Sequence, residues 1–227
     1  MLGHLHRIEG RVIRGDQRGR TIGYPTANLR VHGDRKLVPK IGVYAVRVEH
    51  DGTALVLDPG AFTPDAAAAV DGAAGVLVTH EHPDHWTPEA LRAADAPIWT
   101  IAAVAARIGE QAPDLLERVT VVAPGDSVDV AGVPVRVVGE KHAVIHPELP
   151  HFDNSGYLLT CGDERVFHPG DALTGPGEPV DVLLAPVCAP WMAIAEGIEF
   201  ARSVAAPRTL AIHDKVYSDL ALGIVDQ

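Results

Sequence analysis

The stretch THEHPDH, residues 79–85, places three histidines, one aspartate and one glutamate within seven positions. It directly follows the apolar run VLV at residues 76–78, which is typical of a buried strand. Neutral imidazole and carboxylate groups bind Zn²⁺ at about 2.0–2.2 Å, and a short loop lets several of them converge on one point. A solvent-exposed histidine-rich loop would not account for this density of ligands at a strand end. The stretch therefore predicts a metal site.

Strand-like and helix-like segments alternate on both sides of this stretch, which indicates an α/β fold. Upstream, the run TALVLD at residues 53–58 leads into a Pro59-Gly60 turn. Downstream, Thr87 followed by Pro88 is a helix-start signal. Further apolar segments lie at 97–107, 119–123, 128–138, 156–160, 165–168 and 181–187, and helices are expected at 101–108, 112–117 and 191–204. Several strand-like runs end in His or Asp, so a site at strand ends is expected.

Composition limits the class of protein. The 227 residues are 47% hydrophobic and 22% charged, enough for a core that needs no disulfides. The two cysteines form no CxxC pair, and no apolar run approaches the roughly 18 residues of a membrane span. A net charge of -11 disfavours nucleic acid as a partner. We expect a cytoplasmic protein that acts on a small molecule, without a membrane or nucleic-acid partner; the sequence does not predict its oligomeric state.

The charge is unevenly distributed between two parts of the chain. Residues 1–50 hold ten Lys or Arg and four Asp or Glu, whereas residues 51–227 hold nine and twenty-six. A difference of this size predicts two parts of different character, divided near residue 50.

The second part, from about residue 51 to 225, resembles the metallo-β-lactamase fold hydrolases. Their HxHxDH signature is matched by His80, His82, Asp84 and His85. Three other segments also resemble that family: LDPG at 57–60, FHPGD at 167–171 and AIHD at 211–214. The resemblance implies an αββα sandwich and a metal-dependent hydrolase of the ester, lactone, thioester, phosphoester or similar bond.

The resemblance also implies two divalent metal ions, Zn²⁺ first and Mn or Fe as alternatives, with a metal-bound hydroxide as the nucleophile. Carried over by position, the first metal takes His80, His82 and His142. The second takes Asp84, His85 and His213, and Asp171 bridges the two. Asp84, Asp171 and His146 are the candidate catalytic residues.

Several residues around these ligands have alternative assignments from sequence. His142 is preferred as a ligand because it comes first after the strand-like run at 133–138, but His146 is a second option there. His146 would otherwise contact substrate, protonate a leaving group, or be a surface histidine beside Pro147. Asp58 is expected to accept a hydrogen bond from a ligating histidine and His168 to support the ligands. Three further side chains share a loop with no decided role: His151, Asp153 and Asn154. Trp191 is interpreted as core or pocket wall.

The first 50 residues resemble the opening of the riboflavin kinase domain, through residues 10–29 with PTAN at 25–28 and GVYA at 42–45. The resemblance implies that Thr26 and Asn28 help to bind Mg²⁺ and nucleotide phosphate. The rest of that barrel has no counterpart, so flavokinase activity is not expected. Instead, residues 7–14 and 42–50 are predicted to supply the first strands of the hydrolase sandwich, with a hairpin turn at Asp51-Gly52.

Two other functions compete with the hydrolase reading. The chain could be a nucleotide- or flavin-binding module in which the metal loop is secondary, or a folded but inactive chimera. Metal content and ATP or riboflavin binding separate these three alternatives.

Overall fold

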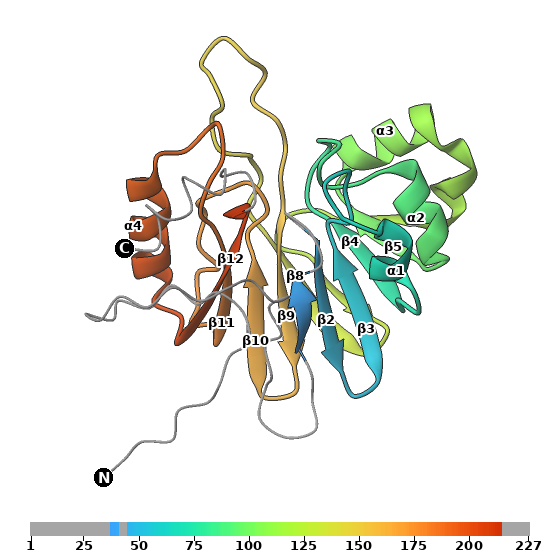
Figure 1. Ribbon diagram of the computed structural model, residues 1–227, viewed down its shortest axis with the longest axis horizontal. Helices are drawn as coiled ribbons and strands as arrows, with labels where there is room; N and C mark the ends of the chain where they lie inside the picture. The colour runs from blue at the N-terminus through green and yellow to red at the C-terminus, as the bar shows by residue number, and fades with distance from the viewer. Residues whose placement is uncertain (1–36, 41–44, 215–227) are drawn as a thin grey trace.

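The computed structural model describes residues 37–40 and 45–214, and this part of the chain forms two packed six-stranded sheets (Figure 1). The first sheet has the order β1-β2-β3-β4-β5-β6 and the second the order β7-β8-β9-β10-β11-β12. The strands of the first sheet are β1 Leu37–Lys40, β2 Val46–His50, β3 Thr53–Leu57, β4 Gly75–Val78, β5 Ile98–Thr100 and β6 Val119–Val121. Those of the second are β7 Ser127–Val130, β8 Val133–Val138, β9 Gly156–Cys161, β10 Glu164–His168, β11 Val182–Pro186 and β12 Arg208–Ile212.

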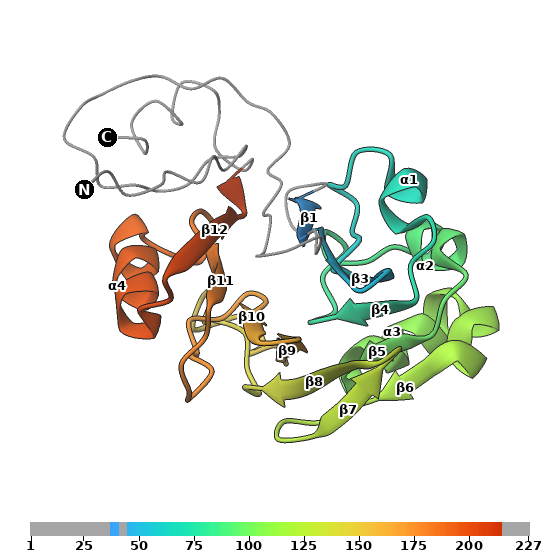
Figure 2. The same cartoon turned by 90° about the horizontal axis from the view of Figure 1, so that it is seen from below.

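Helices cover the outer faces of the two sheets (Figure 2). The first sheet carries α1 Ala66–Val70, α2 Pro88–Ala94, α3 Ala102–Gln111 and the 3₁₀ helix η1 Pro113–Arg118, and the second carries α4 Ile194–Val204. This arrangement is the predicted αββα sandwich, which is therefore confirmed. Within the described residues, no helix is long and apolar enough to cross a membrane.

The alternation of side chains along each strand divides the apolar residues between two layers of core. In β3, Leu55 and Leu57 pack between the sheets, whereas Val56 packs under the helices of the first sheet. In the second sheet Val135 faces the other sheet, while Phe167 packs toward α4. Each fully buried side chain of this size contributes about 1.5–3 kcal/mol. The packing between the sheets fixes which strand ends lie next to one another.

Local signals in the sequence account for several element boundaries. β2 and β3 form an antiparallel hairpin in which His50 pairs with Thr53. Asp51 and Gly52 both have positive φ (48° and 79°), which confirms the predicted turn. Thr87 begins α2 as predicted, because its hydroxyl accepts a hydrogen bond from the Ala90 N–H at 3.1 Å.

One expected helix is corrected, one observed helix was not expected, and other predictions lie outside the described residues or stay untested. The helix expected at 112–117 is the 3₁₀ helix η1, since Pro113 lacks the N–H that would continue α3. Helix α1 was not predicted; Asp65 caps it by accepting from the Ala68 N–H. The strand expected at 7–14 and the sites Thr26 and Asn28 lie outside the described residues and stay predictions, as does the boundary at residue 50.

A hydrogen bond between the sheets lies directly before the histidine stretch. The buried Tyr157 of β9 donates its hydroxyl to the Val78 carbonyl of β4 at 2.8 Å. Burial, together with the nearby charge of Asp58, raises the pKa of Tyr157 well above its usual value, so the hydroxyl keeps its hydrogen. The end of β4 is therefore held against the second sheet.

The turn after β3 packs backbone against backbone with the 79–85 loop, and this contact can be tested. A Cβ on Gly60 would lie 1.8 Å from the Asp84 carbonyl oxygen and 2.3 Å from the His85 nitrogen. Gly60→Ala should therefore displace the loop and destabilise the fold by about 1–3 kcal/mol, measured by urea unfolding of metal-free protein. Zinc affinity, measured by titration calorimetry, should fall in parallel.

Gly175→Ala is the matched control, because its added Cβ would meet only the Val204 side chain at an ordinary 3.8 Å. If Gly60→Ala unfolds and binds zinc like this control, the loop does not depend on the contact.

Candidate metal centre

Five segments bring histidine and aspartate side chains to one end of the two sheets. Each segment follows the carboxyl end of a strand, where loops tolerate irregular backbone. In chain order these are Asp58 after β3, residues 79–85 after β4, His142 after β8, Asp171 after β10 and His213 after β12. The residues that the sequence predicts as ligands thus come from both sheets.

Asp58 fixes the orientation of the 79–85 loop. Its Oδ1 accepts a hydrogen bond from the Thr79 N–H at 2.8 Å, and its Oδ2 accepts one from the Thr79 hydroxyl at 2.7 Å. Oδ2 also lies 2.9 Å from His85 Nδ1, and both side chains are fully buried. A carboxylate oxygen accepts, so Nδ1 carries the hydrogen and the lone pair of neutral His85 is at Nε2. This is the contact that the sequence analysis expected of Asp58.

His80, His82 and His142 form a first group, in which one donor atom from each lies within 4.8 Å of the others. The Thr79 hydroxyl hydrogen goes to Asp58, so its oxygen accepts from His80 Nδ1 at 3.0 Å. His142 Nδ1 donates to the Ala143 carbonyl at 2.6 Å. In the neutral rings, these bonds leave the Nε2 lone pairs of His80 and His142 for the centre.

Burial controls the protonation of this first group. Desolvation, followed by the charges of neighbouring histidines, lowers the pKa of His80 well below its usual value. Desolvation and the proximity of His142 also lower the pKa of His82. Neutral imidazoles can donate lone pairs to a metal ion, so these shifts favour ligand chemistry.

Asp171 lies between the first group and a second pair of histidines, His85 and His213. Its Oδ1 is 3.1 Å from His85 Nε2 and 2.8 Å from His213 Nε2. Its Oδ2 is 3.4 Å from His142 Nε2. Burial acts to raise the pKa of Asp171, but the charges of His213 and His85 outweigh it and hold that pKa well below its usual value. An ionised carboxylate therefore has one oxygen turned toward each group of histidines.

The charge of Asp171 also acts on His85. Burial works to lower the pKa of His85, but Asp171 and Asp58 on its two nitrogens together raise that pKa well above its usual value. The space between the Asp58 and Asp171 carboxylates, which His85 occupies, therefore favours a positive charge.

Two residues hold the Asp171 loop. Asn154 donates to the Pro169 carbonyl at 2.9 Å and accepts from the Asp171 N–H at 3.0 Å. His168 Nδ1 accepts from the Gly170 N–H at 3.0 Å, and desolvation lowers the pKa of His168 to about 4, so this ring is neutral. The sequence suggested a supporting role for His168 but left Asn154 undecided; its position becomes clear only when the loops meet.

Trp191, interpreted from the sequence as core or pocket wall, contacts the Asp171 carboxylate, which the sequence did not predict. Its Nε1 donates to Asp171 Oδ2 at 3.1 Å, and its ring lies edge-on to His142 and His213 at centroid distances of 5.5 and 6.1 Å. It precedes α4, far from the histidine stretch in sequence, and no local pattern marks it as part of the site.

The remaining predicted residues lie at the edge of this cluster or away from it. Asp84 is half-buried and its charge acts on His82, but it is not part of either converging group among the described residues. His146 is exposed and its Nδ1 accepts from the Glu148 N–H. His151 bonds to the His142 carbonyl at 2.8 Å, and Asp153 pairs with Lys141.

Two known proteins resemble this chain over most of its length. A 40% identical relative over 185 residues is Protein Rv0786c of Mycobacterium tuberculosis, with 78% of this chain and 82% of that protein covered. The fold is also that of a candidate metal-dependent hydrolase from Parabacteroides distasonis, with a TM-score of 0.70, 20% identity, and 89% and 92% of the two chains covered.

A separate similarity involves a short part of the chain. Over 52 residues it is 56% identical to the bifunctional riboflavin kinase/FMN adenylyltransferase of Listeria monocytogenes, which covers 23% of this chain and 16% of that enzyme. The match is too partial to carry the enzyme's activity over to this chain.

The model of the β-lactamase superfamily domain matches residues 38–213, a range that includes every side chain of the candidate centre and, except for Leu37, both sheets. The chain belongs to the family of the β-lactamase superfamily domain.

Proposed function

We propose that this chain is a binuclear metal-dependent hydrolase. The observation that supports it most strongly is the position of Asp171, whose two carboxylate oxygens face different groups of histidines. A carboxylate in that position suits two cations held about 3.5–4 Å apart.

The side chains fit divalent cations by their chemistry. With Nδ1 donating to Ala143, the lone pair of neutral His142 at Nε2 faces Asp171 Oδ2 at 3.4 Å. The His80 Nε2 lone pair lies 3.0 Å from His82 Nδ1, whose hydrogen it accepts when no ion is bound. Electron-rich atoms at these separations repel one another unless a proton or a cation lies among them. Imidazole and carboxylate ligands suit Zn²⁺ first. Iron stays an alternative, because a fold neighbour, CmlA from Streptomyces venezuelae, is a diiron β-hydroxylase.

In this proposal the chain's own residues divide the work. His80, His82 and His142 hold the first ion, His85, His213 and Asp84 hold the second, and Asp171 holds both. Bound divalent ions polarise the scissile bond and lower the pKa of water toward neutrality. Asp58 and the Ala143 carbonyl fix the tautomers of His85 and His142, which orients their Nε2 atoms. His146, exposed on its loop, is the candidate for contact with the substrate.

We propose that the bond hydrolysed is an ester, lactone, thioester, phosphoester or similar bond. A fold neighbour is a diphosphatase of the PhnP family, at 17% identity and a TM-score of 0.54, which keeps phosphoesters in this group. We propose a small-molecule substrate and a cytoplasmic location.

A second candidate function rests on the 52-residue similarity to riboflavin kinase. It would make the first 50 residues a nucleotide- or flavin-binding segment that uses Thr26 and Asn28. This function would be supported if the chain binds ATP or riboflavin and the double variant Thr26→Ala, Asn28→Ala abolishes that binding. If neither ligand binds, the hydrolase is the one remaining candidate function.

Metal analysis tests the number of ions and their assignment. Purified protein should hold up to two Zn²⁺, Mn²⁺ or Fe per chain by elemental analysis. His82→Ala should lower occupancy and hydrolysis, whereas Asp84→Ala should spare the first ion more than the second. Equal loss of both ions in Asp84→Ala would contradict the assignment of that carboxylate.

Asp171→Asn tests the bridge while keeping the size of the side chain. An amide nitrogen cannot ligate as a carboxylate oxygen does, so turnover should fall by more than about 100-fold, and the affinity for the second ion should fall with it. Circular dichroism should show an unchanged fold. Turnover within a few-fold of the wild type would mean that another group bridges.

Trp191→Phe tests the indole contact, because it removes the N–H donor and keeps an aromatic ring beside His142. Zinc affinity, measured by competition with a chelator, should fall by about tenfold because the carboxylate is less well oriented. Trp99→Phe is the control, since Trp99 packs against the core between the sheets. If Trp191→Phe binds zinc as tightly as this control, the role of Trp191 is limited to packing.

A further inference from the structure

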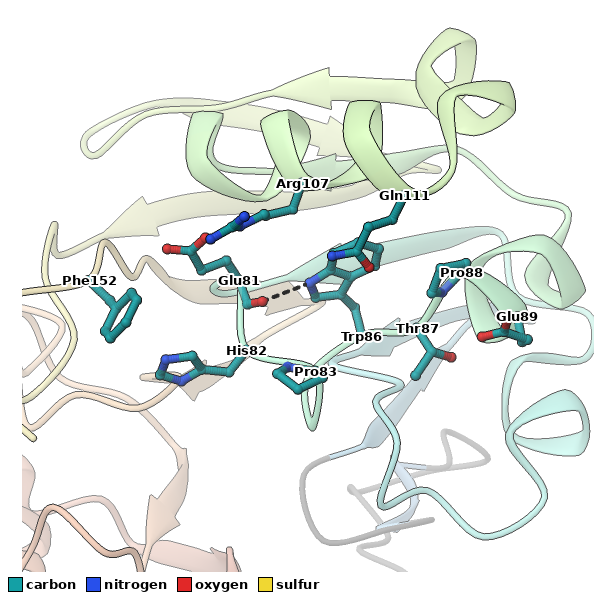
Figure 3. A pocket seen from close by; sticks show the side chains of 10 residues that line it. All are labelled: Glu81, His82, Pro83, Trp86, Thr87, Pro88, Glu89, Arg107, Gln111 and Phe152. Atoms are coloured by element: carbon teal, nitrogen blue, oxygen red, sulfur yellow. Dashed lines mark hydrogen bonds and ion pairs between the residues drawn. The ribbon is translucent and has the colours of Figure 1, made fainter. Parts of the chain in front are cut away.

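A pocket of about 340 Å³ adjoins the candidate centre, and His82 forms part of its wall (Figure 3). It lies between the 79–85 loop, the start of α2 and the α3 helix. This volume is in the range of small-molecule sites. The lining residues are Glu81, His82, Pro83, Trp86, Thr87, Pro88, Glu89, Arg107, Gln111 and Phe152.

Several of the lining residues are apolar. Phe152 packs edge-on against His82, with ring centroids 4.6 Å apart. Trp86 is buried, and its indole N–H donates to the Glu81 carbonyl at 3.2 Å. Because that donor is engaged, Trp86 presents apolar ring surface to the pocket, and Pro83 and Pro88 extend the apolar lining. These contacts favour a ring or a short alkyl group as the occupant.

The cation in the lining is already paired. Arg107 Nε donates to Glu81 at 2.8 Å, and Arg107 Nη1 donates to Glu110 at 3.1 Å. Glu81 is only 16% exposed, so it is a well-placed partner at the pocket edge. Glu89 is a second carboxylate in the lining. An anion that entered would therefore have to compete with Glu81 for Arg107.

We propose that this pocket binds an uncharged apolar substituent of the substrate, next to the bond cleaved at the metal centre, and that Glu81 excludes anions by neutralising Arg107. This inference rests on the proposed function, since it treats the pocket as part of a hydrolase site. Glu81 stands between two candidate ligands in the sequence, so one loop would serve both the metals and the selection of substrate.

Binding of probes that cannot be hydrolysed tests the inference without turnover. Matched probes with one phenyl ring and a short chain that ends in a hydroxyl, a carboxylate or a trimethylammonium group can be titrated by ligand-observed NMR. The neutral probe should bind wild-type protein most tightly, and Phe152→Ala should weaken its binding. A carboxylate or ammonium probe that binds as tightly as the neutral one would overturn the proposal.

Glu81→Gln should leave Arg107 with Glu110 as its one carboxylate partner among these residues, and improve binding of the carboxylate probe by up to about fivefold, the scale of one exposed ion pair, while the neutral probe changes little. Arg107→Gln should give no such gain, and it serves as the second variant if Glu81→Gln folds poorly. Glu199→Gln is the control, because it removes the same charge from the Arg202 pair on α4. If Glu81→Gln does not bind the carboxylate probe more tightly than wild type, or if the control variant gains equally, the proposed role of Glu81 is overturned.

The outcomes also separate this inference from the proposed function. Loss of the metals by His80→Ala should leave binding of the neutral probe in place, because His80 is not part of the pocket lining. A metal-dependent hydrolase that lacks the predicted probe selectivity would overturn only the pocket assignment.

Discussion

The buried carboxylate of Asp58 is the constraint on which the candidate centre depends. Asp58 is fully buried with φ 49°, and it binds the backbone and hydroxyl of Thr79 and the ring of His85. It thus joins the end of β3 to the first and last residues of the 79–85 loop. Loss of one partner from a buried charged network costs about 3–5 kcal/mol. The loop's shape therefore follows from β3 as much as from its own sequence.

The two sheets contribute different parts of the centre, so their packing is a functional requirement. The first sheet carries the 79–85 loop, and the second carries the strands that precede His142, Asp171 and His213. Apolar side chains such as Leu57 fill the space between the sheets, and Tyr157 links them by its bond to Val78. A tightly packed interior prevents one sheet from sliding over the other. This keeps the histidine and aspartate side chains of the candidate centre close to one another.

The 79–85 loop faces two environments. His80 and His82 lie with the cluster around Asp171, while Glu81 pairs with Arg107 at the neighbouring pocket (Figure 3). Phe152 packs edge-on against His82, which belongs both to the histidine cluster and to the pocket lining. If both proposals hold, different residues of this one loop serve metal binding and the selection of substrate.

The sequence by itself determined the features that depend on neighbouring residues. The turn at Asp51-Gly52, the Thr87 cap of α2 and the ligand-rich stretch 79–85 are local patterns, and each appears where it was predicted. Tertiary structure decided which distant side chains meet: His142 rather than His146 lies among the converging rings, and Trp191 reaches Asp171. These contacts follow from the packing of one sheet on the other, which no local spacing encodes.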